Sequence, residues 1–134
     1  RMRLLGLAIN AIQTEYDGKV AVVSVPLSMF TEAGASDDMA EGLVEYGRML
    51  KGVEIAAMLW ERRARADEVC EGSTLTRLSL RSAGKADVAK IAVALGGGGH
   101  RASAGATLSQ DLPSVRRMVL LEAGRELGLS VSGR

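Results

Sequence analysis

The sequence of 134 residues has one cysteine, one histidine and only 3% aromatic side chains. The single Cys70 excludes an internal disulfide and is typical of a reducing compartment, so we expect a cytoplasmic protein. No apolar run approaches the roughly 18 residues that a membrane-spanning helix needs, and no signal-peptide pattern opens the chain. The sequence therefore predicts no membrane partner.

Neither sign of charge is in excess, since 17 Lys and Arg residues against 16 Asp and Glu residues give a formal net charge of +1. Bulk electrostatics do not indicate a nucleic-acid binder, so any anion site must be local. A catalytic zinc site requires three protein ligands, usually including histidines, and a two-metal phosphoesterase site requires several Asp, Glu or His residues. With one histidine and scattered carboxylates, we expect no metal ligands in this segment. No G-x-S-x-G nucleophile elbow is present either.

What the sequence does contain is an ordinary globular composition, 47% apolar and 25% charged, at the length of one domain. Apolar and β-branched runs predict strands over residues 19–25, 53–60, 75–81 and 104–108. Helical periodicity predicts helices over residues 1–13, 36–50, 87–95 and 111–127. We expect a single-domain α/β fold, with a mixed sheet of about four or five strands flanked by helices.

The most informative motif is a run of four glycines, Gly96, Gly97, Gly98 and Gly99, followed by His100. Such a run is entropically costly, because glycine loses more backbone freedom on folding than any other residue. One interpretation is a loop of bare amides that an anion such as phosphate approaches, with the imidazole as an added donor. The other is a flexible loop or hinge. The run follows a helix C-terminus, whose dipole disfavours an anion.

Cationic and hydroxyl side chains near this run favour phosphate recognition. Arg81 and Ser82 end a predicted strand, and Arg101 follows His100. Arginine presents a planar fork that suits phosphate oxygens. Taken alone, Arg81 is better explained as an exposed charge at the end of a strand. The basic segment 62–65 is better explained as a solvated loop than as a nucleic-acid contact, because acidic residues follow it directly.

Several motifs together resemble the DHH-associated C-terminal domain of the DHH phosphoesterase family. They occur in family order over roughly residues 17 to 125: Glu41–Tyr46, Lys51–Glu54, Leu78–Ser82 ahead of Asp87-Val88, and Gly96–His100 followed by Ala104-Gly105. The likeness is strongest to the branch that degrades nano-RNA and hydrolyses phosphoadenosine phosphate. One departure is Ser103, where family members commonly have alanine.

The resemblance implies a division of labour. Residues 1–14 would be a helical connector from a missing N-terminal catalytic domain, which holds manganese through Asp and His residues including an Asp-His-His motif. Residues 15–134 would be the substrate-binding domain, without catalytic residues or cofactor of its own and inactive alone. Its partners would be that DHH domain and short RNA or DNA oligonucleotides or small phosphorylated nucleotides. The phosphate-binding residues would be Arg81, Ser82, Gly96, Gly97, Gly98, Gly99, His100 and Arg101.

Two other functions are consistent with the same motifs. The first is an RNA-binding module like the related C-terminal domain of alanyl-tRNA synthetases, in which a glycine-rich loop helps to bind tRNA. The second is a structural dimerisation domain, and homodimerisation is left open in the phosphoesterase interpretation as well. The preferred nucleotide, including a cyclic dinucleotide, is not determined by these residues.

Overall fold

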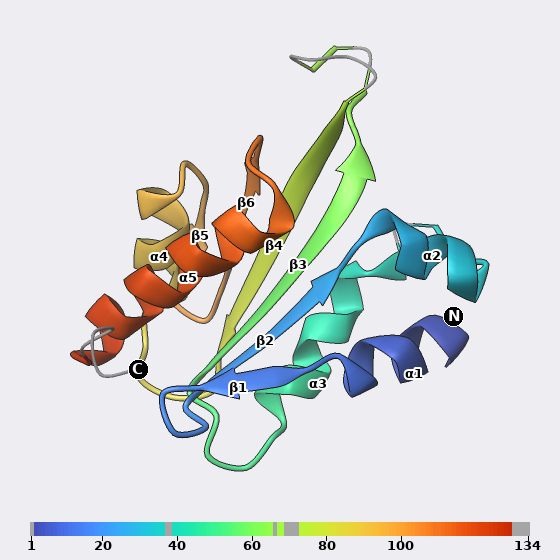
Figure 1. Cartoon of the computed structure of the whole chain (residues 1–134). Helices are drawn as coiled ribbons and strands as arrows, with labels where there is room; N and C mark the ends of the chain where they lie inside the picture. The colour runs from blue at the N-terminus through green and yellow to red at the C-terminus, as the bar shows by residue number, and fades with distance from the viewer. Residues whose placement is uncertain (1, 37–38, 66, 69–72, 130–134) are drawn as a thin grey trace.

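A six-stranded mixed sheet forms the centre of the computed structural model, which describes residues 2–36, 39–65, 67–68 and 73–129 (Figure 1). The strands are β1 (Gln13–Glu15), β2 (Val20–Val25), β3 (Ile55–Arg63), β4 (Thr74–Ser82), β5 (Gly98–His100) and β6 (Ser103–Leu108). Their order is β1-β2-β3-β4-β6-β5, and only β2 and β3 run parallel. The expected α/β class is confirmed, although the sheet has six strands instead of four or five.

Helices cover the two faces of this sheet, and each face has its own apolar core. On one face, α4 (Val88–Ala94) and α5 (Leu112–Leu127) pack over side chains of β2, β3, β4 and β6. On the other, α1 (Met2–Asn10), α2 (Leu27–Ala33), the 3-10 turn η2 (Glu41–Leu43) and α3 (Val44–Arg48) pack over β2 and β3. None of the helices in the described ranges is both long and apolar enough to cross a membrane.

The second helical layer stops at β4, so one face of β4, β6 and β5 stays open. Along β6, Ala104, Ala106 and Leu108 are buried under α4 and α5, whereas the alternate residues Ser103 and Thr107 are exposed. Since successive side chains of a strand point to opposite faces, the exposed side chains lie on the face of the sheet that α4 and α5 do not cover. We call this surface the open face. The residues on this side of the three strands are Arg77, Ser79, Arg81, Gly98, His100, Ser103, Gly105 and Thr107, of which Ser79 is buried.

The predicted helix starts at Asp87 and Asp111 are confirmed by side-chain caps. An Asp87 carboxylate oxygen accepts a hydrogen bond from the Ala89 N–H at 3.0 Å, and Asp111 accepts one from the Ser114 N–H at 3.0 Å. These bonds satisfy amides that the first helical turn leaves unpaired. The capping side chains of Asp87 and Asp111 therefore set the start of α4 and of α5.

The helix predicted over 36–50 is shorter in the structure, where η2 leads into the single short helix α3. Part of this prediction, the acidic first turn at Asp37 and Asp38, lies outside the described residues. Within α3, Gly47 lies against the sheet, where an added Cβ would make an ordinary van der Waals contact with the Ala56 Cβ at 3.4 Å. Glycine is a poor helix former, so Gly47 favours an early end of α3.

Beyond the sheet, β3 and β4 continue as a long hairpin that rises past the other strands (Figure 1). At its tip the Arg62 guanidinium donates two hydrogen bonds, of 2.9 and 2.7 Å, to the carboxylate of Glu68. The same carboxylate accepts the Arg65 N–H. These bonds, chiefly those from Arg62, lower the pKa of Glu68 from 4.5 to about 2. The lone Cys70 lies outside the described residues.

The lowered pKa of Glu68 predicts a pH-dependent contribution to stability. The ionised form is favoured in the folded state, so the contribution is complete above about pH 4.5 and is lost as the pH falls toward 2. We expect the difference in unfolding free energy between wild type and Glu68→Gln to be constant above pH 5 and to shrink below it. Urea denaturation across this pH range measures the difference. A difference that stays constant down to pH 3 would contradict the assignment.

Candidate functional site

Strand register places three polar side chains in one row across the open face. Arg81 of β4 pairs with Ser103 of β6, and Ser103 pairs with His100 of β5. Residues paired in this way on antiparallel strands point to the same face of the sheet. The structure therefore brings together Arg81 and His100, which lie 19 positions apart in the sequence.

His100 ends β5 at a tight turn that the rest of the domain holds in place. The Ala102 carbonyl accepts the Ser82 N–H at 3.0 Å, and the Arg101 carbonyl accepts the Val88 N–H at 2.9 Å. The imidazole of His100 is exposed, and no partner for it occurs among the described residues. A fixed backbone thus presents a side chain that is free to contact a ligand.

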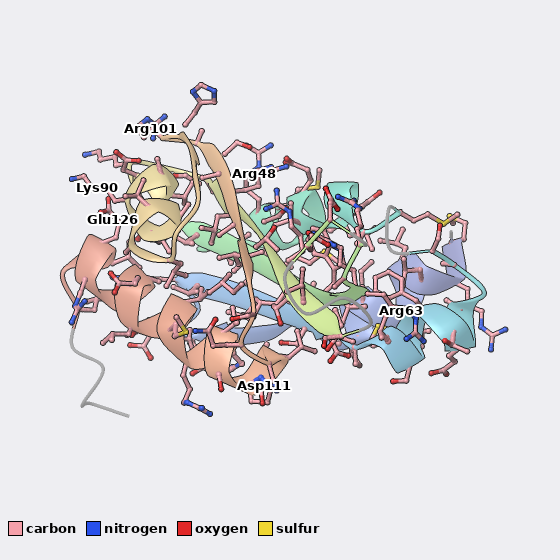
Figure 2. The ribbon with its side chains drawn as sticks, turned by 90° about the horizontal axis from the view of Figure 1, so that it is seen from above. Arg48, Arg63, Lys90, Arg101, Asp111 and Glu126 are labelled. Carbon is pink, nitrogen blue, oxygen red and sulfur yellow. The ribbon has the colours of Figure 1, made fainter. Side chains whose placement is uncertain are left out.

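Arg101 has a different role in this structure from His100. Its guanidinium donates to the Gly84 carbonyl at 2.9 Å and, more weakly, to the Ala86 carbonyl at 3.5 Å. Figure 2 shows Arg101 and Arg48 on the same side of the molecule, away from the face on which Asp111 lies. Arg101 fastens the turn to the loop before α4, and its predicted phosphate contact stays a prediction.

Arg81 is held by a carboxylate that sequence reasoning did not single out. Its Nε donates to Glu45 of α3 at 2.8 Å, and its Nη1 donates to the Leu80 carbonyl at 2.9 Å. The other oxygen of Glu45 pairs with Arg48 at 2.7 Å. Only 16% of the Arg81 side chain is exposed. Glu45 thus bridges two arginines and orients the partly buried one, leaving the Nη2 end of its fork without a partner among the described residues.

Ser82 does not join this row. It follows Arg81 directly in β4, so its side chain points to the opposite face, where it is buried. Its hydroxyl accepts the Gly84 N–H at 3.3 Å and lies 3.2 Å from the Gly84 carbonyl. The structure therefore separates the hydroxyl from the guanidinium that sequence reasoning placed beside it, and the predicted ligand contact of Ser82 stays untested.

Half of the glycine run belongs to the end of α4. The Gly96 N–H donates to the Val93 carbonyl at 3.0 Å, and the Gly97 N–H donates to the Ala92 carbonyl at 2.7 Å. With Gly96 at φ +90°, this is a Schellman motif, in which glycine takes the left-handed position that ends a helix. These two amides are used by the helix end, and the next three residues, Gly98, Gly99 and His100, pair with β6 as strand β5.

A run of glycines suggests that something packs closely against the backbone, and here it is largely the neighbouring strand β6 that does so. A Cβ on Gly97 would overlap the Gly105 carbonyl oxygen and lie 2.6 Å from the Ala106 Cβ. One on Gly99 would lie 2.7 Å from the Ser103 carbonyl oxygen. Gly98, in contrast, has no atom within 4 Å of such a position and faces the open side. Gly98 is therefore the glycine of the run that neither packing nor a positive φ requires.

The expected loop at 96–99 is thus partly a strand, because Gly98 and Gly99 pair with Gly105 and Ala104 as β5. Sequence reasoning missed it, since glycines show no alternation of apolar and polar side chains. As for metals, the described part of the chain contains no group of three or more His, Cys, Asp or Glu side chains that would hold an ion.

A family profile described as the DHHA1 domain matches residues 8–123, which is most of the chain. The chain belongs to the DHHA1 domain family. It is 33% identical over 127 residues to the bifunctional oligoribonuclease and PAP phosphatase NrnA of Thermus thermophilus. That alignment covers 92% of this DHHA1 domain and 34% of the relative.

The fold is shared with a solved structure of an exopolyphosphatase-related protein from Bacteroides fragilis. The TM-score is 0.76 at 21% identity, over 94% of this chain and 35% of the other. This DHHA1 domain thus spans about a third of the length of the two relatives. The resemblance predicted from the glycine-histidine motif and its neighbours is confirmed.

The glycine geometry predicts opposite outcomes for two adjacent substitutions in this DHHA1 domain. Gly97→Ala forces backbone movement between β5 and β6, so it should destabilise the domain by at least about 2 kcal/mol. Gly98→Ala meets no atom and needs no unusual φ, so its stability should stay within about 1 kcal/mol of wild type. Urea denaturation of both variants makes the comparison, and equal effects would contradict it.

The bridge through Glu45 predicts a second stability difference. Glu45→Ala leaves the guanidinium of Arg81 partly buried without its carboxylate, so it should cost about 1–2 kcal/mol after allowance for solvent screening. Glu122→Ala is the matched control, because its Arg125 partner is 66% exposed. That pair should contribute less than about 0.5 kcal/mol. Thermal or urea unfolding tests both, and an equal loss in the two variants would refute the special role of Glu45.

Proposed function

We propose that this chain is the substrate-binding domain of a DHH-family phosphoesterase. The proposed substrates of the complete enzyme are short oligonucleotides, phosphoadenosine phosphate or cyclic dinucleotides. The observation that carries the proposal is the row of Arg81 and His100 on an open face, in a domain of a family whose curated relative is an oligoribonuclease and phosphatase. That relative is about three times as long, which leaves room for a catalytic domain elsewhere in such a chain.

The chemistry of the row suits a phosphate group. A guanidinium oriented by Glu45 presents N–H donors in a fixed fork, and the exposed imidazole at the other end of the row adds a donor from a second direction. Arg48 stands beside the same carboxylate. Donors positioned before the ligand arrives lose little freedom on binding, so they stabilise phosphate charge efficiently.

The end of α4 would oppose an anion if its carbonyls were free. In this domain the N–H groups of Gly96 and Gly97 donate to the carbonyls of Val93 and Ala92. These bonds reduce the negative potential at the end of the helix, directly before β5. Gly98 adds space beside His100, where a larger side chain would obstruct a ligand.

The proposed division of labour places manganese in a DHH domain of the same polypeptide. The described residues of this chain do not fit a metal centre, because they contain no suitable cluster of ligands. We therefore derive no catalytic step through a metal here. The part of this domain is to bind the phosphate and to orient the substrate toward another domain.

An RNA-binding module like that of alanyl-tRNA synthetases remains the alternative, and the curated relative, a hydrolase, supports the phosphoesterase instead. Salt dependence separates the two. Binding of tRNA neutralises many phosphates and should weaken steeply with salt, whereas binding of a dinucleotide should weaken only slightly.

Substitutions on the open face test the proposal in the full-length protein that contains this domain. His100→Ala should lower kcat/KM for dinucleotides and phosphoadenosine phosphate by about 30- to 1,000-fold, as expected for a lost contact to phosphate charge. Gly98→Val should also lower it, because its side chain projects over the ligand while a β-branched residue suits a strand. Manganese-dependent hydrolysis assays measure both variants.

Arg117→Ala is the control, since Arg117 is exposed on α5, far from the open face in the fold. It should leave kcat/KM unchanged. Near-wild-type kinetics for both His100→Ala and Gly98→Val would refute the proposed site. Manganese-dependent hydrolysis by residues 1–134 alone would refute the division of labour.

A further inference from the structure

Arg77 extends the open face beyond the row of Arg81 and His100. It lies four residues before Arg81 in β4, so the two side chains point to the same face with their Cα atoms about 13 Å apart. The guanidinium of Arg77 lies over Gly105, since its Nη2 is 3.0 Å from where a Cβ of that glycine would be. Its Nη1 is 3.4 Å from the hydroxyl of Thr107, the β6 residue that pairs with Arg77 in the sheet.

Within the described part of the chain, Arg77 has no carboxylate partner, in contrast to its neighbours on this side of the sheet. Arg81 and Arg48 share the carboxylate of Glu45, and Arg62 is paired with Glu68. Among the described residues, no carboxylate lies within ion-pair distance of Arg77. A half-buried guanidinium without a counterion attracts an anion more strongly than one that a neighbouring carboxylate neutralises.

The residues between the two arginines on this face are small. Gly105 has no side chain, so the Arg77 guanidinium can lie directly over it, and Ser79, between Arg77 and Arg81, is buried. The Arg77 guanidinium lies over Gly105, which pairs with Ser79, and Arg81 pairs with Ser103 farther along β6. A ligand that uses both arginines therefore extends along β6 from Ser103 past Gly105.

We propose that Arg77 and Thr107 form a second phosphate subsite, which binds a further backbone phosphate of an oligonucleotide whose end is bound at Arg81 and His100. This inference rests on the proposed function and deepens it. The subsite gives the domain a preference for length, because only substrates that reach Arg77 gain its contact. Dinucleotides and phosphoadenosine phosphate bind at the first row alone.

Arg77→Met in the full-length protein tests the subsite, since methionine keeps an unbranched apolar stem over Gly105 and removes the charge. The substrates are a dinucleotide, phosphoadenosine phosphate and a pentanucleotide, assayed with manganese at several salt concentrations. For the pentanucleotide, KM should rise about tenfold with kcat nearly unchanged, as expected for one lost charged hydrogen-bonding contact. The slope of log affinity against log salt should fall by about 0.7. For the two short substrates, kcat/KM should change less than about twofold.

Arg117→Met is the matched control, because Arg117 is an exposed arginine on α5. It should leave KM and kcat unchanged for all three substrates. Arg77→Lys keeps the charge without the fork and should restore most of the salt slope. An equal loss for short and long substrates with Arg77→Met would overturn the subsite, and so would no loss for the pentanucleotide. If the wild-type protein hydrolyses none of the three substrates, the proposed function itself fails, which is a distinct result.

Discussion

The close approach of three strand backbones is the constraint on which the open face depends. β5, β6 and β4 lie so near one another that Gly97, Gly99 and Gly105 have no room for a Cβ. For Gly105, the obstacle is the Leu78 carbonyl oxygen, 2.7 Å from where that atom would be. Backbone overlap of this kind cannot be relieved by a rotamer change, so the glycines are needed for the sheet edge to close.

The glycine run therefore has two structural roles, which cannot be told apart from the sequence of identical residues. Gly96 and Gly97 end α4 through the Schellman motif, and Gly97 and Gly99 allow β5 to pair with β6. Gly98 is required by neither. Because the run first ends a helix and then forms an edge strand, it brings His100 from the helical side of the domain to the open face.

Electrostatic compensation shapes the same surface. Glu45 binds Arg81 and Arg48 together, which fixes the direction of the Arg81 fork and also reduces the net positive charge beside it. The local charge differs along β4, because among the residues that the structure describes Arg81 has a carboxylate partner and Arg77 has none. A domain with a formal net charge of +1 can thus have a locally cationic face, because its carboxylates are placed selectively.

Features of this fold that depend only on residues close together in the sequence could be predicted from it. The caps at Asp87 and Asp111 and the apolar runs of β2 and β3 needed only local patterns, and the structure confirms them. The short strands β1 and β5 were missed, since three residues show too little alternation and glycines show none. The helix predicted over 36–50 was too long, since residues 41–43 form the 3-10 turn η2 and α3 ends at Arg48, next to Gly47, a poor helix former.

The candidate site divides in the same way. By itself, the sequence determined that phosphate-binding residue types gather near a glycine-histidine motif, and that the ligands of a metal centre are scarce, because composition and motif order are local properties. Only the tertiary structure decided which of those residues meet. Strand register aligned Arg81 with His100, the alternation of β4 turned Ser82 to the opposite face, and α3 placed Glu45 against an arginine 36 positions away. Such pairings depend on the packing of distant segments, which no local pattern specifies.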